Sequence, residues 1–321
     1  MTSVSIIIPF KDQTEKELSL ALASINGQIG VDFSEIDVQL VNDGGAAIEV
    51  NKFEIFSNLR IHYHELPENV GPGLARQYGI DHSESDYLMF IDADDELHYT
   101  GALLDFFNVL KESASHQIII GKYIEQYLVA GNEFRYQVYD YNWKALYAKC
   151  FQRDYLKQLN LHFHPKLRLF EDMYFVGLAC ELATDIHYLN SVVYSWLFNA
   201  NSLVRSGGRS YEHQTHLWVK QCQYHLEFLQ KAAPERLNAA FENYLVDIYF
   251  RSRAYPPEDE KAFWQAHCEL IKTFSQIWQP YNVSLQLKAD KMSQETPMWK
   301  GKSPEAFEVF MKETEQKLEE S

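Results

Sequence analysis

The chain has 321 residues, of which 46% are hydrophobic and 14% aromatic, and this is enough apolar material for one large core or for a core with a second lobe. Global disorder is therefore excluded. The 29 basic and 45 acidic side chains give a formal net charge of −16, so a nucleic-acid backbone would be repelled over most of the surface. We expect no nucleic-acid partner, and a phosphate-bearing ligand would need a metal ion, a helix N-terminus or a few placed basic side chains.

The cysteines lie far apart in the sequence, at Cys150, Cys180, Cys222 and Cys268. This spacing fits neither a zinc site nor a redox motif, and it predicts buried thiols in a reducing compartment. The first residues carry no basic segment, their apolar run is too short for a signal peptide, and no later stretch is long and apolar enough to cross a bilayer. We therefore expect a cytoplasmic protein, at most peripheral to the inner face of a membrane.

Short apolar runs alternate with helix-period segments over residues 4–91. The runs predict buried strands and the segments predict helices: strands at 5–8, 38–41, 60–63 and 87–91, and helices at 15–25 and 71–82. Strands that alternate with helices predict an α/β fold with a mostly parallel, Rossmann-like sheet and helices on both faces.

The pattern changes after a helix that we expect at about residues 100–113. Residues 117–128 and 133–139 are separated by the turn residues Gly131 and Asn132, which predicts a β-hairpin or a long antiparallel excursion.

From about residue 210 the pattern is mainly helical, with a break at Pro256 and Pro257. The charged end from Lys312 to Ser321 is expected to fray. The helical region suits packing on the first domain, self-association or shallow membrane contact, and its acidic balance favours a homodimer or a protein partner over the membrane.

Acidic side chains follow two of the predicted strands. Residues 92–95 (Asp-Ala-Asp-Asp) come directly after the strand that ends at Ile91, and Asp43 follows the strand at 38–41. The carboxyl ends of parallel strands face one crevice, where clustered carboxylates repel one another unless they share a cation. Mg²⁺ or Mn²⁺ would bind there and could also hold a diphosphate. The alternatives are a solvated acidic loop that caps the next helix and an ordinary turn at Asp43.

A loop with two glycines precedes the second predicted helix. Gly71 and Gly73 permit close approach of the backbone, and Arg76 is placed to meet a phosphate or a carboxylate. The alternative is that the glycines only shape a turn and that Arg76 lies on a solvated face.

Taken together, these segments resemble family 2 glycosyltransferases of the bacterial type, which have the GT-A fold. The matching segments occur in the order and approximate spacing of that family: 6–10, 40–44, 69–76 and 92–95, then 143–147, 161–163 and 170–175. The resemblance covers about residues 4–205. It implies a catalytic domain at 1–205, with a nucleotide-sugar half at 1–98 and an acceptor half at 99–205, and a helical region at 206–321.

The resemblance also implies a role for individual residues. The donor would be held by Pro9, Phe10, Asp43, Asn69, Gly71, Arg76, Asp92, Ala93 and Asp94. Asp94 would also bind Mn²⁺ or Mg²⁺. The acceptor would meet Trp143, Lys144 and Glu171, and Asp172 would be the general base.

The activity implied is inverting, metal-dependent transfer of a hexosyl or N-acetylhexosaminyl group. The donor would be a nucleotide sugar, and the acceptor a hydroxyl of a glycan, a lipid-linked sugar or a glycoprotein. Two other functions stay open: a non-catalytic glycan- or partner-binding module on the same fold, and a sugar-1-phosphate nucleotidyltransferase. The second lacks its glycine-rich basic loop, because Pro9 and Phe10 follow the first strand.

One alternative interpretation and one departure from the family pattern remain. Glu171 and Asp172 could also be an acidic pair that only stabilises a helix start through the helix dipole. Related sequences often have a basic side chain soon after the last core strand, where it helps to hold the diphosphate or the metal. Here no basic side chain follows Tyr194 before Arg205, and the resemblance implies that Arg205 or Arg209 takes this role, with Gly207 and Gly208 as the hinge of a lid.

Overall fold

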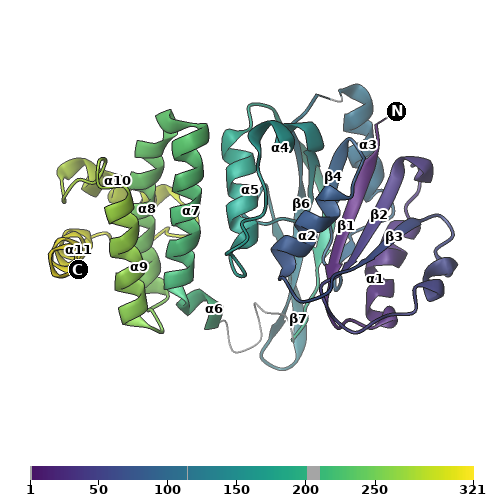
Figure 1. Ribbon diagram of the computed structural model, residues 1–321, viewed down its shortest axis with the longest axis horizontal. Helices are drawn as coiled ribbons and strands as arrows, with labels where there is room; N and C mark the ends of the chain where they lie inside the picture. The colour runs from purple at the N-terminus through teal and green to yellow at the C-terminus, as the bar shows by residue number, and fades with distance from the viewer. Residues whose placement is uncertain (1, 114, 201–209) are drawn as a thin grey trace. The chain divides into compact units, whose positions relative to one another are not determined.

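The computed structural model describes residues 2–113, 115–200 and 210–321. The chain divides into two compact units, Met1–Ala200 and Asn201–Ser321. The first contains a sheet with helices and the second contains helices (Figure 1). The candidate diphosphate residues Arg205 and Arg209 and the candidate hinge at Gly207 and Gly208 lie outside the described residues.

The first four strands of the sheet are parallel, as the sequence predicts. They lie in the order β3-β2-β1-β4: β1 (Val4–Phe10), β2 (Ile36–Asn42), β3 (Arg60–Glu65) and β4 (Tyr87–Phe90). The connections contain α1 (Glu15–Asn26) and α2 (Pro72–Asp81), with two short 3₁₀ helices, Phe33–Glu35 and Val50–Ile55. These strands and helices confirm the predicted alternation.

The remaining strands make the other part of the sheet mixed rather than parallel. They are β5 (Glu96–Leu97), β6 (Ile118–Val129), β7 (Glu133–Tyr139), β8 (Lys149–Gln152) and β9 (Ile186–Trp196). Strand β8 runs antiparallel between β4 and β6, whereas β9 runs parallel to β6. The predicted hairpin is confirmed, because β7 pairs antiparallel with β6. The part of the sheet that carries Asp43 and residues 92–95 is thus parallel throughout, whereas the other part combines parallel and antiparallel pairs.

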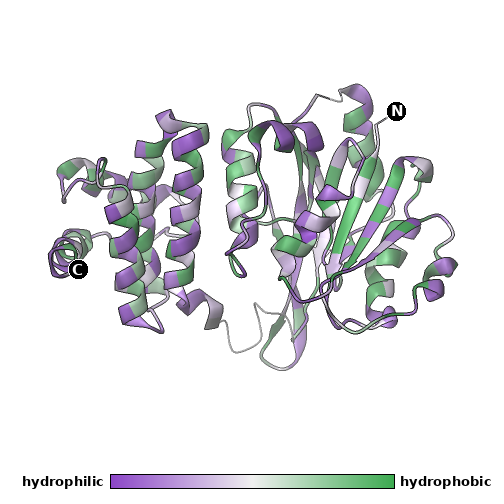
Figure 2. Ribbon diagram, in the orientation of Figure 1, coloured by the Kyte–Doolittle hydropathy of each residue, from purple (hydrophilic) through white to green (hydrophobic). Residues whose placement is uncertain are grey.

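Helices cover both faces of this sheet, which explains why its central strands are continuously apolar. On one face, Ile6 and Ile8 of β1 join a core with α1 and with α3 (Ala102–Glu112). On the other face, Gly79 of α2 lies against Ile7, and Phe175 of α5 (Glu171–Leu182) packs on rings of the sheet. A short helix, α4 (Arg153–Leu159), follows β8. In Figure 2 the central strands are green and the helices have both green and purple faces.

The second unit is helical in the part that the structure describes. Its helices are α6 (Ser210–His213), α7 (Thr215–Ala232), α8 (Pro234–Ala254), α9 (Glu260–Thr273), α10 (Val283–Glu295) and α11 (Phe307–Glu320). The predicted break falls between α8 and α9. The expected fraying is wrong, because α11 continues to Glu320 with Met311 and Thr314 buried on its inner face. Among the described residues, no helix is long and apolar enough to cross a membrane.

A buried histidine lies at the centre of this helical unit. The hydroxyl of Thr314 donates to the Phe310 carbonyl at 2.9 Å, so its oxygen accepts from Nε2 of His267 at 3.2 Å. Nδ1 of His267 then accepts from the Tyr244 hydroxyl at 2.6 Å. Both ring nitrogens are therefore satisfied in the neutral form, and burial lowers the pKa of His267 to about 3.

We expect the helical unit to lose stability on acidification because of His267. In the unfolded chain the imidazole takes up a proton below its ordinary pKa of 6.5, whereas the folded state excludes that proton down to about pH 3. Stability from this group is thus present above pH 6.5 and falls by about 1.4 kcal/mol per pH unit below it. Urea unfolding between pH 7.5 and 4.5, followed by circular dichroism, should give a shallower pH dependence for His267→Asn than for the wild type.

The matched control is His225→Asn, at a half-buried position of α7. It should keep the wild-type slope. Parallel curves for the wild type and His267→Asn would show that this histidine does not set the acid sensitivity.

Candidate active site

Arg76 joins the end of β4 to the start of α5. It lies on α2 and is only 7% exposed. Its Nη2 donates to a carboxylate oxygen of Asp92 at 2.7 Å, and its Nη1 donates to Glu171 at 3.1 Å. Burial alone would lower the pKa of Arg76, but the carboxylates of Asp92 and Glu171 outweigh it and raise the pKa above its usual value. The alternative of a solvated Arg76 is therefore wrong.

The loop before α2 is held by Asp43. Both oxygens of this buried carboxylate accept backbone N–H groups, from Val70 at 2.7 Å and from Gly71 at 2.9 Å. Gly71 adopts a φ of 95°, a conformation that L side chains rarely adopt, so glycine is needed there. Arg168 donates to the backbone oxygen of Asn69 in this loop at 3.2 Å. The two predicted donor residues Asp43 and Gly71 thus lie together, with Arg168 as a neighbour that the sequence did not single out.

Gly73 lets α2 approach α5 closely. A Cβ atom at this position would lie 2.8 Å from Cγ of Glu171 and 3.3 Å from the ring of Phe163, both buried residues. The Arg76–Glu171 contact therefore depends on the missing side chain at position 73.

We expect Gly73→Ala to lower the free energy of unfolding by about 2 kcal/mol, because the new methyl group overpacks a buried contact. Urea unfolding of the purified protein measures this. Gly27→Ala is the control: Gly27 is at the exposed end of α1, and its Cβ would meet only the Ala23 carbonyl oxygen at 3.2 Å. It should change stability by no more than about 0.5 kcal/mol. Equal effects of the two substitutions would contradict the close α2–α5 approach.

The acidic segment after β4 is fixed by β9. The buried Asp95 accepts from the Tyr194 hydroxyl at 2.7 Å and from the Leu197 N–H at 2.8 Å. Burial, Asp92 and Asp94 raise its pKa well above the usual range. The Tyr194 oxygen also accepts from the Asp92 N–H at 3.1 Å. The segment leads into β5 rather than into a helix, so the helix-capping alternative is wrong.

Asp94 is the residue of this segment that suits a metal ion. Its Oδ2 accepts from the amide nitrogen of Asn199 at 2.7 Å, and the residue is half-buried. Among the described residues, no three His, Cys, Asp or Glu side chains are grouped to hold a metal ion. Mg²⁺ and Mn²⁺ are commonly held by one or two carboxylates together with substrate phosphates, and an oxygen ligand such as Asp94 fits that mode. The neighbouring carboxylates have partners in the protein: Asp92 pairs with Arg76, and Asp95 with Tyr194.

The Glu171–Asp172 pair begins α5 directly after a residue in a left-handed conformation, Phe170 with a φ of 62°. Burial and then the charge of Asp172 raise the pKa of Glu171 to about 7, although Arg76 opposes this shift. Burial also raises the pKa of Asp172, again against the effect of Arg76. A pair that only stabilised the helix start would be solvated, whereas Glu171 is buried against a guanidinium. The site therefore holds two carboxylates that burial makes stronger proton acceptors.

The predicted acceptor residues Trp143 and Lys144 are exposed in the loop before β8. The Trp143 side chain is 44% exposed, and its indole N–H donates to the Tyr188 hydroxyl at 3.2 Å. The backbone N–H of Lys144 donates to Asn142.

Tyr147, from the same loop, is half-buried next to Tyr194, whose hydroxyl donates to Asp95. Its ring stacks on Tyr194 with a centroid distance of 4.8 Å. Burial, followed by the charges of Tyr123, Asp95, Asp92 and Asp172, raises its pKa well above the usual range. The loop therefore reaches from the surface into the carboxylate cluster.

The other predicted donor residues lie at the end of β1 and around it. Pro9 and Phe10 are buried at the carboxyl end of β1, and the Phe10 ring lies 6.4 Å from that of Tyr63. Ala93 is buried between the two aspartates.

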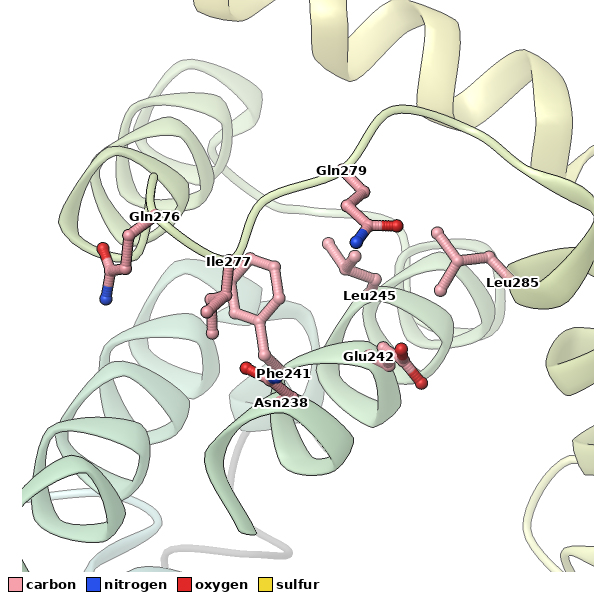
Figure 3. A pocket seen from close by; sticks show the side chains of 8 residues that line it. All are labelled: Asn238, Phe241, Glu242, Leu245, Gln276, Ile277, Gln279 and Leu285. Atoms are coloured by element: carbon pink, nitrogen blue, oxygen red, sulfur yellow. The ribbon is translucent and has the colours of Figure 1, made fainter. Parts of the chain in front are cut away.

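A separate cavity of about 150 Å³ lies inside the helical unit (Figure 3). Its lining comes from α8, from α10 and from the segment between α9 and α10: Asn238, Phe241, Glu242, Leu245, Gln276, Ile277, Gln279 and Leu285. None of the predicted site residues belongs to this lining.

Known proteins resemble this chain in sequence and in fold. The family model described as "Glycosyl transferase family 2" matches residues 5–175. Poly(ribitol-phosphate) beta-N-acetylglucosaminyltransferase TarP from Staphylococcus aureus is 33% identical over 130 residues, which are 38% of this chain and 37% of TarP. The match thus spans little more than a third of that relative.

Two solved structures show the fold. TarS of S. aureus, residues 1–349 in complex with UDP-GlcNAc, has a TM-score of 0.68 and 17% identity, over 99% of this chain and 91% of that one. Mannosyltransferase PcManGT from Pyrobaculum calidifontis, in complex with GDP-Man and Mn²⁺, has a TM-score of 0.52 and 12% identity, over 98% and 86%. The expected GT-A architecture is confirmed by the likeness to TarS. Because the family model covers more than half of its residues, the chain belongs to glycosyl transferase family 2.

Proposed function

We propose that this protein transfers a sugar from a nucleoside-diphosphate sugar to an acceptor hydroxyl, with inversion at the anomeric carbon. The observation that carries the proposal is the bridge through Arg76, which brings Asp92 at the end of β4 and the Glu171–Asp172 pair at the start of α5 into one cluster. UDP-GlcNAc is the first donor to test, because the structure of TarS was solved with it.

On the donor side, the residues at the carboxyl ends of the parallel strands bind the nucleotide and the diphosphate. Pro9, Phe10 and the loop held by Asp43 shape the nucleotide end, with Asn69 and Gly71 in that loop. Asp94, oriented by Asn199, would hold Mn²⁺ or Mg²⁺. A divalent ion there would stabilise the negative charge that builds on the leaving diphosphate.

On the acceptor side, Asp172 takes the proton of the incoming hydroxyl. An alcohol is a weak nucleophile, so a carboxylate within hydrogen-bond reach must accept its proton as it attacks. The raised pKa of Asp172 makes this carboxylate a better proton acceptor. Attack from the side opposite the diphosphate inverts the anomeric configuration in one displacement.

The acceptor itself is a glycan, a lipid-linked sugar or a glycoprotein, and it meets Trp143, Lys144 and Glu171. The proposed catalytic domain is 1–205, with its donor half at 1–98 and acceptor half at 99–205, and the helical region 206–321 serves self-association or a protein partner. The free thiols of the buried Cys150 and Cys180 are consistent with a cytoplasmic location.

The proposal is tested by thermal shift with UDP-, GDP- and dTDP-sugars in the presence of Mn²⁺. A ligand at 100 times its Kd stabilises the folded state by about 2.7 kcal/mol, which gives a clear rise in melting temperature. We expect UDP-GlcNAc with Mn²⁺ to stabilise the wild type, and Asp94→Ala to abolish the Mn²⁺-dependent part of the shift.

The control is Asp154→Ala, which removes an exposed aspartate of α4 and should leave the shift unchanged. If every donor leaves the wild type unstabilised while glycans bind, the protein is a glycan-binding module instead. If Asp94→Ala keeps the full Mn²⁺ effect, Asp94 is not the metal ligand.

A further inference from the structure

Lys149 is a buried cation that the donor and acceptor roles above do not use. It is the first residue of β8 and is only 1% exposed. In the part of the chain that the structure describes, it makes no ion pair; its Nζ donates to the carbonyl oxygens of Ala145 at 2.6 Å and of Tyr147 at 3.4 Å. A buried lysine without an ion pair is rare, because a hydrophobic side chain of similar size costs less to bury. The burial of Lys149 therefore calls for an explanation in terms of the groups that it contacts.

The hydrogen bonds of Lys149 tie the loop from Trp143 to Tyr147 to the start of β8. Between the two accepting carbonyls and β8 lies Ala148, whose φ of 57° is left-handed for a residue with a side chain. Such a conformation persists only when the surroundings fix it. The ammonium group donates hydrogen bonds to the backbone immediately before this position. It thereby fixes the backbone conformation in which the Tyr147 ring stacks on Tyr194.

Lys149 also lies on the α5 face of the sheet. Phe151, two residues further along β8 and hence on the same face, packs against Phe175 of α5. Burial lowers the pKa of Lys149 to about 8, and Cys180 and Asp172 of α5 oppose that shift. The electrostatic interaction is mutual, so a protonated Lys149 favours the ionised form of Asp172.

We propose that Lys149 is a positioning residue for sugar transfer, which fixes the loop of residues 145–148, and with it Tyr147, and places a positive charge on the face of the sheet that carries α5 and Asp172. This inference rests on the proposed role of Asp172 as the base. Lys149 acts through the loop and through Asp172 and needs no contact with the substrate.

The test compares Lys149→Met, Lys149→Gln and the wild type in the release of UDP from UDP-GlcNAc with Mn²⁺, where water replaces the acceptor. Methionine fills the buried space but removes the donors and the charge; glutamine keeps an N–H donor without the charge. We expect Lys149→Met to lower kcat at least about tenfold, with the KM for UDP-GlcNAc within about twofold of the wild type. The acidic limb of its pH–rate profile should move to higher pH, because the charge that favours the Asp172 carboxylate is lost. Lys149→Gln should show the same displaced limb.

Hydrogen exchange of the backbone amides of residues 145–148 measures how rigidly the loop is held, independently of catalysis. Lys149→Met should lose at least about tenfold in protection there, and Lys149→Gln should lose less. The control is Lys157→Met on α4, an exposed lysine, which should match the wild type in every measurement.

Wild-type kcat, pH profile and exchange in Lys149→Met would overturn the inference. If the wild type itself releases no UDP from any donor, the proposed function fails. The exchange data then decide alone whether Lys149 holds the loop.

Discussion

Replacement of Asp172 by asparagine is expected to lower kcat for UDP release from UDP-GlcNAc by about 10³-fold, because the variant cannot accept the proton of the attacking water, which takes the place of the acceptor hydroxyl in this assay. The substitution keeps the shape of the side chain. In the wild type the backbone N–H of Met173 donates to Asp172 at 2.7 Å, and the amide oxygen of asparagine can accept the same hydrogen bond. The affinity for UDP-GlcNAc and Mn²⁺ should stay within a few-fold of the wild type. Steady-state kinetics and thermal shift on the same preparations measure both quantities.

The matched control for this variant is Asp154→Asn, at the exposed aspartate of α4. It should behave as the wild type. Equal turnover by Asp172→Asn and the wild type would remove Asp172 from the mechanism, whereas parallel loss of turnover and of donor binding would assign it a structural role.

Replacement of Arg76 by methionine is expected to cost the sheet unit about 3 kcal/mol of stability and to abolish turnover. Removing one partner of a buried ion pair leaves an uncompensated charge, which typically costs about 3–5 kcal/mol. We expect a loss at the lower end of this energy range because the Asp92 side chain is 34% exposed and is partly solvated. Urea unfolding followed by circular dichroism measures the loss.

A second variant separates the charge effect from simple loss of packing. In Arg76→Met combined with Glu171→Gln, the buried carboxylate that lost its partner is neutral. We expect this double variant to be more stable than Arg76→Met alone, which is the signature of direct coupling between positions 76 and 171. Additive losses, or an Arg76→Met protein as stable as the wild type, would contradict the bridge.

Local patterns in the sequence predicted the parallel half of the sheet well. The β-branched run of β1 and the apolar run of β4 are buried on both faces. A strand of this kind is a continuous apolar run in the sequence, which can be recognised without knowledge of its neighbours. The family resemblance added the residues of the donor side and the Glu171–Asp172 pair. The mixed half of the sheet was harder to predict, because the antiparallel insertion of β8 between β4 and β6 leaves no local mark in the sequence.

The partners of the site residues could not be predicted for a similar reason. Arg76 and Glu171 lie 95 positions apart, and Asp94 and Asn199 lie 105 apart, so each contact is a product of tertiary packing. The same holds for α11, whose charged sequence predicts a frayed end but whose apolar side chains are buried within the helical unit. Lys149 gave no signal either, because nothing in the sequence separates a buried lysine from an exposed one.

The most direct test of the proposed mechanism is a crystal structure of the protein with UDP-GlcNAc and Mn²⁺. We predict that the metal ion is bound by Asp94 and by the diphosphate, and that the anomeric carbon of the sugar faces Asp172 across the space next to Arg76. A nucleotide sugar bound away from both Asp94 and Asp172, for example in the cavity of the helical unit, would contradict the account.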